Sequence, residues 1–278
     1  MHSHATKDLI RVGIAMIKSS GLSVWMVVLS LVVLGGCSTI FGSTAADRLV
    51  PVSEENKLGD EMKVELEREL ELSDDEELVT YIRQLGNTMV NQATVPEGIE
   101  FEFFVVDDDD MVNAFAIPGG GIYVFTGLIL AMDDEAELAG VMGHEVAHVT
   151  RRHIAQRLVA IYSTEIISQM AFGEEPGLLR QLVTAVAQQG FMLSYSRANE
   201  RDADYYGVQY MVDAGYDPRG LIDFFEKLSD APQPPAFLST HPAPTERMQN
   251  IEEHIAEFDR VPNERHRDRF QEMKARIQ

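Results

Sequence analysis

The chain has 278 residues, of which 45% are hydrophobic and 24% charged, a composition typical of one well-packed globular domain rather than a disordered or membrane-embedded chain. Its formal net charge of −22 argues against binding to nucleic acid or to an anionic lipid surface, because both recruit Lys and Arg. The single cysteine excludes an internal disulfide and a thiolate zinc site.

The N-terminus has the pattern of a secretory signal peptide. A basic lead-in precedes an apolar stretch of about 14 residues, which is short of the roughly 20 that span a bilayer. Residues 34–37, L-G-G-C, resemble the lipobox of bacterial lipoproteins, in which the Cys becomes the lipidated N-terminus. We therefore predict a lipoprotein signal peptide at 1–36 and lipid attachment at Cys37. An incidental Cys at the end of an ordinary signal or anchor is the alternative.

The lipobox also predicts a location for the protein. Ser38 follows the Cys, and the absence of Asp at this position resembles outer-membrane rather than inner-membrane lipoproteins. Residues 37–52 carry Gly, Ser, Thr and Pro without periodicity, which indicates a tether. We expect a periplasmic protein that is lipid-anchored to the outer membrane and has one folded domain at 53–278.

The folded body is predicted to be α+β and mostly helical. The first helices are expected at 54–72 and 74–90, with Ser53 and Ser73 as their N-caps. Short apolar runs predict strands at 101–106, 114–117 and 122–125, and a Pro-Gly-Gly-Gly turn joins the last two strands as a hairpin. Later helices are expected at 135–156, onward to 172, at 177–189, 196–214, 245–258 and 263–277, with a Pro-rich loop at 231–244.

An H-E-x-x-H motif lies within the predicted helix at 135–156. Residues four apart on a helix share a face, so His144 and His148 can bind one Zn²⁺. Glu145 projects beside them and can take a proton from a metal-bound water. Because the motif also occurs by chance, it needs a third ligand before it predicts a catalytic zinc site with an open fourth position.

The residues just after the motif do not supply that ligand. The metzincin pattern would place Gly at position 151 and His at position 154, where this chain has Arg and Ile, so that class is excluded. His153 lies roughly 140° further round a continuous helix than His148. We therefore expect His153 to be a surface or second-helix contact rather than a ligand.

Glu200 is the favoured third ligand. Glu200 and Asp204 are four residues apart on a later predicted helix and face the same way. Glu200 can then bind zinc while Asp204 accepts an N–H from a ligating His, which fixes the tautomer of that ring. A solvated acidic helix face in a very acidic protein is the alternative.

Four patterns in this order resemble the HtpX-like and BepA-like gluzincin metallopeptidases, relatives of the CAAX prenyl endopeptidase and of the mitochondrial Oma protease. They are N-A-F-A-x-P-G-G from Asn113, the H-E-x-x-H motif, S-R-x-x-E-x-x-A-D from Ser196, and T-H-P at 240–242 with Arg247. The match covers residues 53 to 251. With its lipobox, without predicted membrane spans and without a repeat domain, the chain resembles the small LoiP- or YcaL-type envelope lipoproteins.

The resemblance implies a zincin-like fold with a small sheet beside the H-E-x-x-H helix, one zinc ion per chain, and cleavage of unfolded or misassembled envelope proteins. In such enzymes the strand leading into Pro118 pairs with an extended substrate. His241 would lie near the metal, where it either stabilises the oxyanion of the reaction or occupies the open zinc position and keeps the enzyme latent. A loop His on the surface is the alternative for His241. The alternative function is a latent peptidase that acts mainly as a chaperone-like outer-membrane assembly factor.

Overall fold

The computed structural model of the chain describes residues 50–189, 195–231, 235–242 and 244–277. The chain divides into two compact units between residues 42 and 43, and all of the described residues belong to the second unit. The predicted signal peptide at 1–36, Cys37 and most of the predicted tether lie outside the described residues. No helix within the described ranges is long and apolar enough to cross a membrane.

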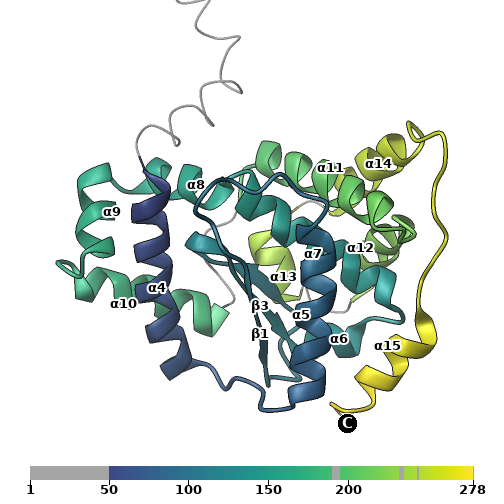
Figure 1. Cartoon of the computed structure of the whole chain (residues 1–278), viewed down its shortest axis with the longest axis horizontal. Coiled ribbons are helices and arrows are strands. Elements are labelled where there is room, and N and C mark those ends of the chain that lie inside the picture. Colours follow the sequence, from purple (N-terminus) through teal and green to yellow (C-terminus); the bar gives the residue numbers. More distant parts are fainter. Residues whose placement is uncertain (1–49, 190–194, 232–234, 243, 278) are drawn as a thin grey trace, which may run out of the picture. The chain divides into compact units, whose positions relative to one another are not determined.

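The described body is mostly helical and contains a small three-stranded sheet, which confirms the predicted fold class (Figure 1). Its first elements are α4 (Val52–Glu69), α5 (Glu76–Val90), β1 (Glu102–Val106), β2 (Ala114–Ala116), the 3-10 turn η1 (Pro118–Gly120), β3 (Gly121–Phe125) and α6 (Thr126–Ala131). The remaining helices are α7 (Glu135–Thr150), α8 (His153–Ile161), α9 (Thr164–Ala171), α10 (Pro176–Gln189), α11 (Arg197–Asp213), α12 (Arg219–Asp230), α13 (Ala236–Thr240), α14 (Pro244–Ile255) and α15 (Arg267–Lys274).

The sheet has the order β1-β3-β2, with β1 parallel and β2 antiparallel to β3. The predicted hairpin therefore forms, and Gly119 and Gly120 take positive φ angles of 81° and 107° in its turn. Ile117 and Asn113 make backbone hydrogen bonds to β3 at the two ends of β2. In an antiparallel ladder the intervening positions face away from the partner, so the backbone groups of Ala114 and Ala116 point to the other edge of β2.

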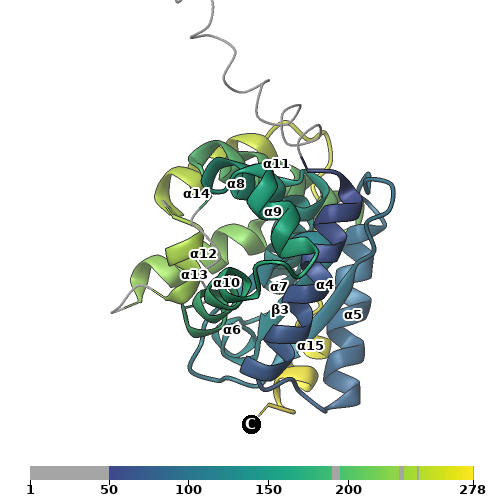
Figure 2. The ribbon, with the colours of Figure 1, turned by 90° about the vertical axis from the view of Figure 1, so that its left-hand side faces the viewer.

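Helix α7, which carries the H-E-x-x-H motif, is buried along its whole length. Figure 2 shows α4 and α5 on one side of α7 and α12 on the other, and α7 packs against α5, α11 and α12. The crossing with α11 is close because Gly143 of α7 and Gly207 of α11 meet there. A Cβ atom on Gly207 would lie 3.0 Å from the backbone nitrogen of His144. This close approach brings the α11 carboxylates to the histidines of α7.

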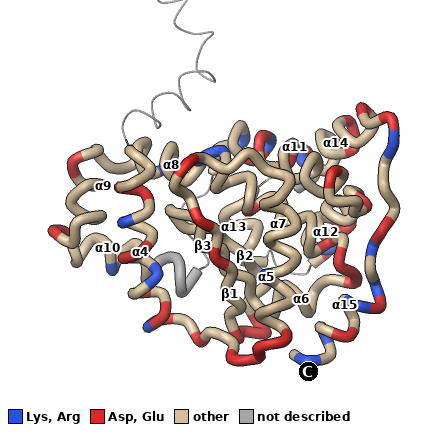
Figure 3. The backbone as a smooth tube through the Cα atoms, viewed as in Figure 1, with Lys and Arg blue, Asp and Glu red and all other residues tan. Residues whose placement is uncertain are grey.

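The N-terminus of α7 is held by the C-terminal segment of the chain. Asp134 caps the helix through the backbone N–H of Glu137, 3.3 Å away, and accepts a hydrogen bond of 2.7 Å from Arg265 Nε. The backbone N–H of Glu135 donates to the Arg265 carbonyl at 3.1 Å. Figure 3 shows Lys and Arg at intervals along this segment on the right-hand side. The segment thus fixes the start of the motif helix with charge-assisted hydrogen bonds.

Both predicted N-caps of the first two helices are wrong. Helix α4 begins earlier than expected, after Pro51, whose φ of −56° already suits a helix start. Ser53 is consequently inside the helix. Helix α5 is capped by Asp75 rather than Ser73, because the Asp75 carboxylate accepts from two backbone N–H groups of the first turn at 3.0 Å each.

The predicted continuous helix at 135–156 is also wrong. Helix α7 ends at Thr150, Arg152 takes a left-handed conformation with φ 55°, and α8 starts anew at His153. A left-handed non-glycine residue is uncommon, and it redirects the chain within two residues. The expected continuation to residue 172 is in fact two helices, because Ser163 caps α9 through the N–H of Ile166 at 3.3 Å.

Three helices were not predicted. Helices α6 and α13 have 6 and 5 residues, which is too short for a helical repeat of apolar residues to show. Helix α12 follows directly after Pro218, which serves as its N-cap as well as ending the preceding segment. Helix α13 matters most, because it lies in the expected loop at 231–244 and directly precedes His241.

Replacing Gly59 with Ala should destabilise the fold. An added Cβ would lie 2.0 Å from the carbonyl oxygen of Pro118, where α4 packs on the glycine turn. We expect the free energy of unfolding to fall by about 1–3 kcal/mol, measured by urea denaturation. The matched control is Gly177→Ala in α10, where a Cβ meets nothing within 4 Å and stability should be unchanged or slightly higher. Equal midpoints for Gly59→Ala and wild type would contradict this packing.

Candidate metal centre

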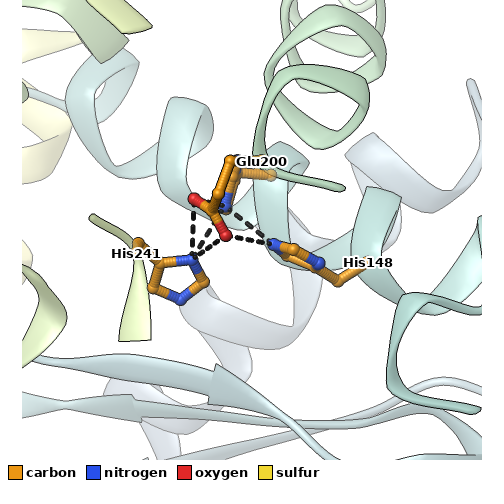
Figure 4. Close-up of side chains that lie close together, drawn as sticks. His148, Glu200 and His241 are labelled. Carbon is orange, nitrogen blue, oxygen red and sulfur yellow. Dashed lines mark hydrogen bonds and ion pairs between the residues drawn. The ribbon is translucent and has the colours of Figure 1, made fainter. Parts of the chain in front are cut away.

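Four buried side chains from three parts of the fold converge on one point. His144 and His148 come from α7, Glu200 comes from the first turn of α11, and His241 directly follows α13. One ligand atom from each lies within 4.8 Å of all the others. Figure 4 shows the Glu200 carboxylate between the rings of His148 and His241. The two histidines of the H-E-x-x-H motif and Glu200, the favoured third ligand, therefore lie together.

The donor atoms suit a tetrahedral cation. His144 Nε2 lies 3.0 Å from His148 Nε2, and these two nitrogens lie 3.7 Å and 3.6 Å from the oxygens of Glu200. Four ligands around a tetrahedral zinc ion at about 2.0–2.1 Å would lie roughly 3.3 Å from one another. Imidazole nitrogens and a carboxylate are also the ligand types that zinc prefers in proteins. The residues therefore fit a zinc ion.

Asp204 lies behind His144, as its spacing from Glu200 predicted. Asp204 Oδ1 is 3.0 Å from His144 Nδ1, so this nitrogen donates its proton to the carboxylate. His144 Nε2 then carries a lone pair that faces the cluster. Burial lowers the pKa of His144 to about 4, so the ring is neutral at neutral pH. A neutral, oriented imidazole is the form that binds a metal.

Arg247 joins the two carboxylates of α11. Its Nε and Nη2 donate to the oxygens of Asp204 at 2.7 Å and 2.6 Å, and its Nη1 lies 2.7 Å from Glu200 Oε2. Burial alone would raise the pKa of Asp204, but the buried guanidinium of Arg247 holds it well below its usual value. The sequence pattern contained Arg247 but gave it no role. Its spacing six residues after His241, at a predicted helix start, is the only signal that could have suggested one.

Glu145 is completely buried beside the cluster. Burial raises the pKa of its carboxyl to about 7. Its closest ionic neighbour is His241 Nε2, 3.4 Å from Oε1, and the backbone N–H of Ala116 also faces the carboxylate and lowers its pKa in part. A buried carboxylate whose pKa lies near 7 can accept a proton from a bound reactant near neutral pH.

His241 takes the fourth corner of the cluster and is not on the surface. Its Nδ1 lies 3.1 Å from both His144 Nε2 and Glu200 Oε1. The ring stacks on Phe237 of α13 with a centroid separation of 4.4 Å. Burial lowers the pKa of His241, but the carboxylates of Glu200 and Glu145 raise it above the ordinary value.

Two further side chains surround His148. The ring of Tyr195 stacks on it with centroids 3.8 Å apart, and the backbone N–H of Tyr195 donates to the Thr240 carbonyl at 3.2 Å. On the other side, His153 Nδ1 lies 3.1 Å from His148 Nδ1. His153 was expected to be either a surface contact or a contact from a second helix. It is a contact from a second helix, and it is buried. No role for Tyr195 was predicted, because a single aromatic residue before the N-cap Ser196 forms no recognisable sequence motif.

The helix-borne histidines, the α11 glutamate and the neighbouring sheet define a zincin-like metallopeptidase. Residues 76–255, more than half of the chain, match the family model described as peptidase family M48. The chain belongs to this family.

The chain is also similar to named proteases. It is 32% identical over 219 residues to the beta-barrel assembly-enhancing protease of Escherichia coli (strain K12), covering 74% of this chain and 44% of that protein. It is 37% identical over 153 residues to the mitochondrial metalloendopeptidase OMA1 of Arabidopsis thaliana, covering 54% of this chain and 31% of that protein. The chain therefore spans less than half the length of these relatives.

Replacing Asp204 with Asn should weaken zinc binding. The amide cannot hold the His144 N–H and Arg247 as a carboxylate does, so we expect zinc affinity to fall about 10- to 100-fold. Competition with a coloured chelator measures the affinity directly. The control is Asp213→Asn, an exposed change at the end of the same helix, which should leave affinity unchanged. Unaltered affinity in Asp204→Asn would refute the orienting role.

Proposed function

We propose that this chain is an endopeptidase that cleaves unfolded or misassembled proteins in the bacterial envelope, with zinc bound by His144, His148 and Glu200. One observation carries this proposal: a buried carboxylate, Glu145, lies beside converging zinc-type ligands. The envelope location rests on the lipobox-like residues 34–37 and on the similarity to a protein named beta-barrel assembly-enhancing protease.

The roles of the side chains follow from their positions. Zinc, when bound, polarises a peptide carbonyl and makes water more acidic. Glu145, with a pKa of about 7, accepts a proton at its carboxylate and later returns it to the leaving amine. Asp204 keeps His144 in the tautomer whose Nε2 is free to bind. Arg247 supports Asp204 and Glu200 through buried hydrogen bonds and ion pairing.

The edge of β2 is the proposed platform for the substrate. The backbone groups of Ala114 and Ala116 point away from β3, and an extended peptide could pair with this edge where the Ala116 N–H now faces Glu145. Such pairing recognises the main chain of a peptide more than its side chains, which suits an enzyme that cleaves unfolded segments. Lipid attachment at Cys37 and anchoring to the outer membrane remain part of the proposal.

The substitution Glu145→Gln should abolish cleavage while zinc stays bound, because the amide keeps the shape but cannot accept the proton. We expect at least a roughly 100-fold loss of casein cleavage. Metal analysis of the same sample should still give one zinc per chain. The control Glu252→Gln, on the exposed face of α14, should behave as wild type. Full casein cleavage by Glu145→Gln would rule out Glu145 as the base.

A second candidate function has structural support of its own: a latent peptidase that acts mainly as a chaperone-like assembly factor. His241 Nδ1 takes the corner of the cluster that water or substrate would need. The proposed platform is also covered, since Ala114 and Ala116 are 0% and 1% exposed. Client binding that persists in Glu145→Gln, together with weak cleavage by wild type, would favour this function.

Replacing His241 with Ala tests latency. Because its Nδ1 faces the ligand corner, we expect His241→Ala to increase casein cleavage by opening that corner. The double variant His241→Ala/Glu145→Gln is the control and should cleave nothing. A loss of roughly 100- to 1000-fold in His241→Ala would instead mean that His241 stabilises the oxyanion.

A further inference from the structure

The turn between α7 and α8 creates a contact that a continuous helix could not. Had α7 continued, His153 would lie roughly 140° round the axis from His148. Instead Arg152 adopts φ 55°, and α8 begins at His153. His153 returns beneath the motif helix, with its Nδ1 3.1 Å from His148 Nδ1 and only 2% of its surface exposed.

The protons along this contact can be assigned one by one. For His148 Nε2 to bind zinc, its proton must be on Nδ1, where it is donated to His153 Nδ1. The proton of His153 is then on Nε2, which lies 3.2 Å from Asp202 Oδ2 and donates to it. Arg151 Nε donates to the same carboxylate oxygen at 2.8 Å. Every nitrogen of both rings therefore has one defined role.

We propose that His153 and Asp202 are positioning residues for the zinc site, which hold His148 in its metal-binding tautomer and orientation. This inference rests on the proposed function in that it takes His148 as a zinc ligand. It gives the site two outer supports, since Asp204 serves His144 and the pair of His153 and Asp202 serves His148.

The proposed support also joins the two helices that supply the ligands. Asp202 is two residues after Glu200 on α11, whereas His153 is five residues after His148 beyond the end of α7. The chain of hydrogen bonds therefore connects the element carrying one ligand to the element carrying another. Such outer partners commonly contribute about 10- to 100-fold to metal affinity.

Zinc release separates this role from simple space filling. His153→Leu removes both hydrogen bonds, whereas His153→Asn keeps an acceptor close to the position of Nδ1. Asp202→Ala removes only the outer partner. The control is His254→Leu, which removes another buried imidazole, one in α14 whose Nδ1 lies 3.1 Å from Glu257 Oε2. Each zinc-loaded protein is mixed with excess chelator, and unfolding of the zinc-free forms checks that each variant folds.

We expect His153→Leu to release zinc about 10- to 100-fold faster than wild type, with Asp202→Ala between the two. His153→Asn should recover most of the difference, and its Co²⁺-substituted form should share the visible spectrum of wild type. His254→Leu should release zinc at the wild-type rate.

The proposal fails if His153→Leu and Asp202→Ala release zinc as slowly as wild type, or if His153→Asn is as fast as His153→Leu. If His153→Leu does not fold, Asp202→Ala and His153→Asn still decide between these outcomes. Zinc release is measured without cleavage. Wild-type protein that holds zinc but cleaves no casein would therefore count against the proposed function and not against this positioning role.

Discussion

The site depends on two imidazole nitrogens that face each other across 3.0 Å, His144 Nε2 and His148 Nε2. When each ring carries its proton on Nδ1, as zinc binding through Nε2 requires, the two lone pairs repel, and the rings are held by contacts on their far sides, from His144 to Asp204 and from His148 to His153. The close crossing of α7 and α11 holds the rings and the carboxylates together. The fold thus prepares a cation site and bears its repulsion before the cation binds.

Charge balance leads to the same ion. Three carboxylates, those of Glu145, Glu200 and Asp204, are buried together with one guanidinium, that of Arg247. Burying unbalanced charge costs several kcal/mol per ion unless a partner is present. With all three carboxylates ionised and the histidines neutral, the guanidinium of Arg247 leaves two negative charges, which a divalent cation neutralises. In the metal-free protein the raised pKa values of Glu145 and His241 partly relieve the same excess of negative charge.

Local spacing made part of the site predictable. Two residues four apart on one helix share a face whatever the rest of the fold does, so the pairs His144 with His148 and Glu200 with Asp204 could be assigned from sequence. His153 could not, because its position depends on the left-handed conformation of Arg152, which residues other than glycine seldom adopt. The position of His241 depends on α13, a helix of 5 residues that is too short to show a helical repeat in the sequence.

The left-handed Arg152 also binds the first of the described residues. Its guanidinium donates to the carboxylate of Glu55 in α4 and to the backbone carbonyl of Val50, and Glu55 is almost fully buried. A pulling force transmitted to Val50 would therefore act on this ion pair. Arg152 directly precedes His153, which contacts the proposed zinc ligand His148. Mechanical load on Val50 would therefore reach the chain one residue before this contact.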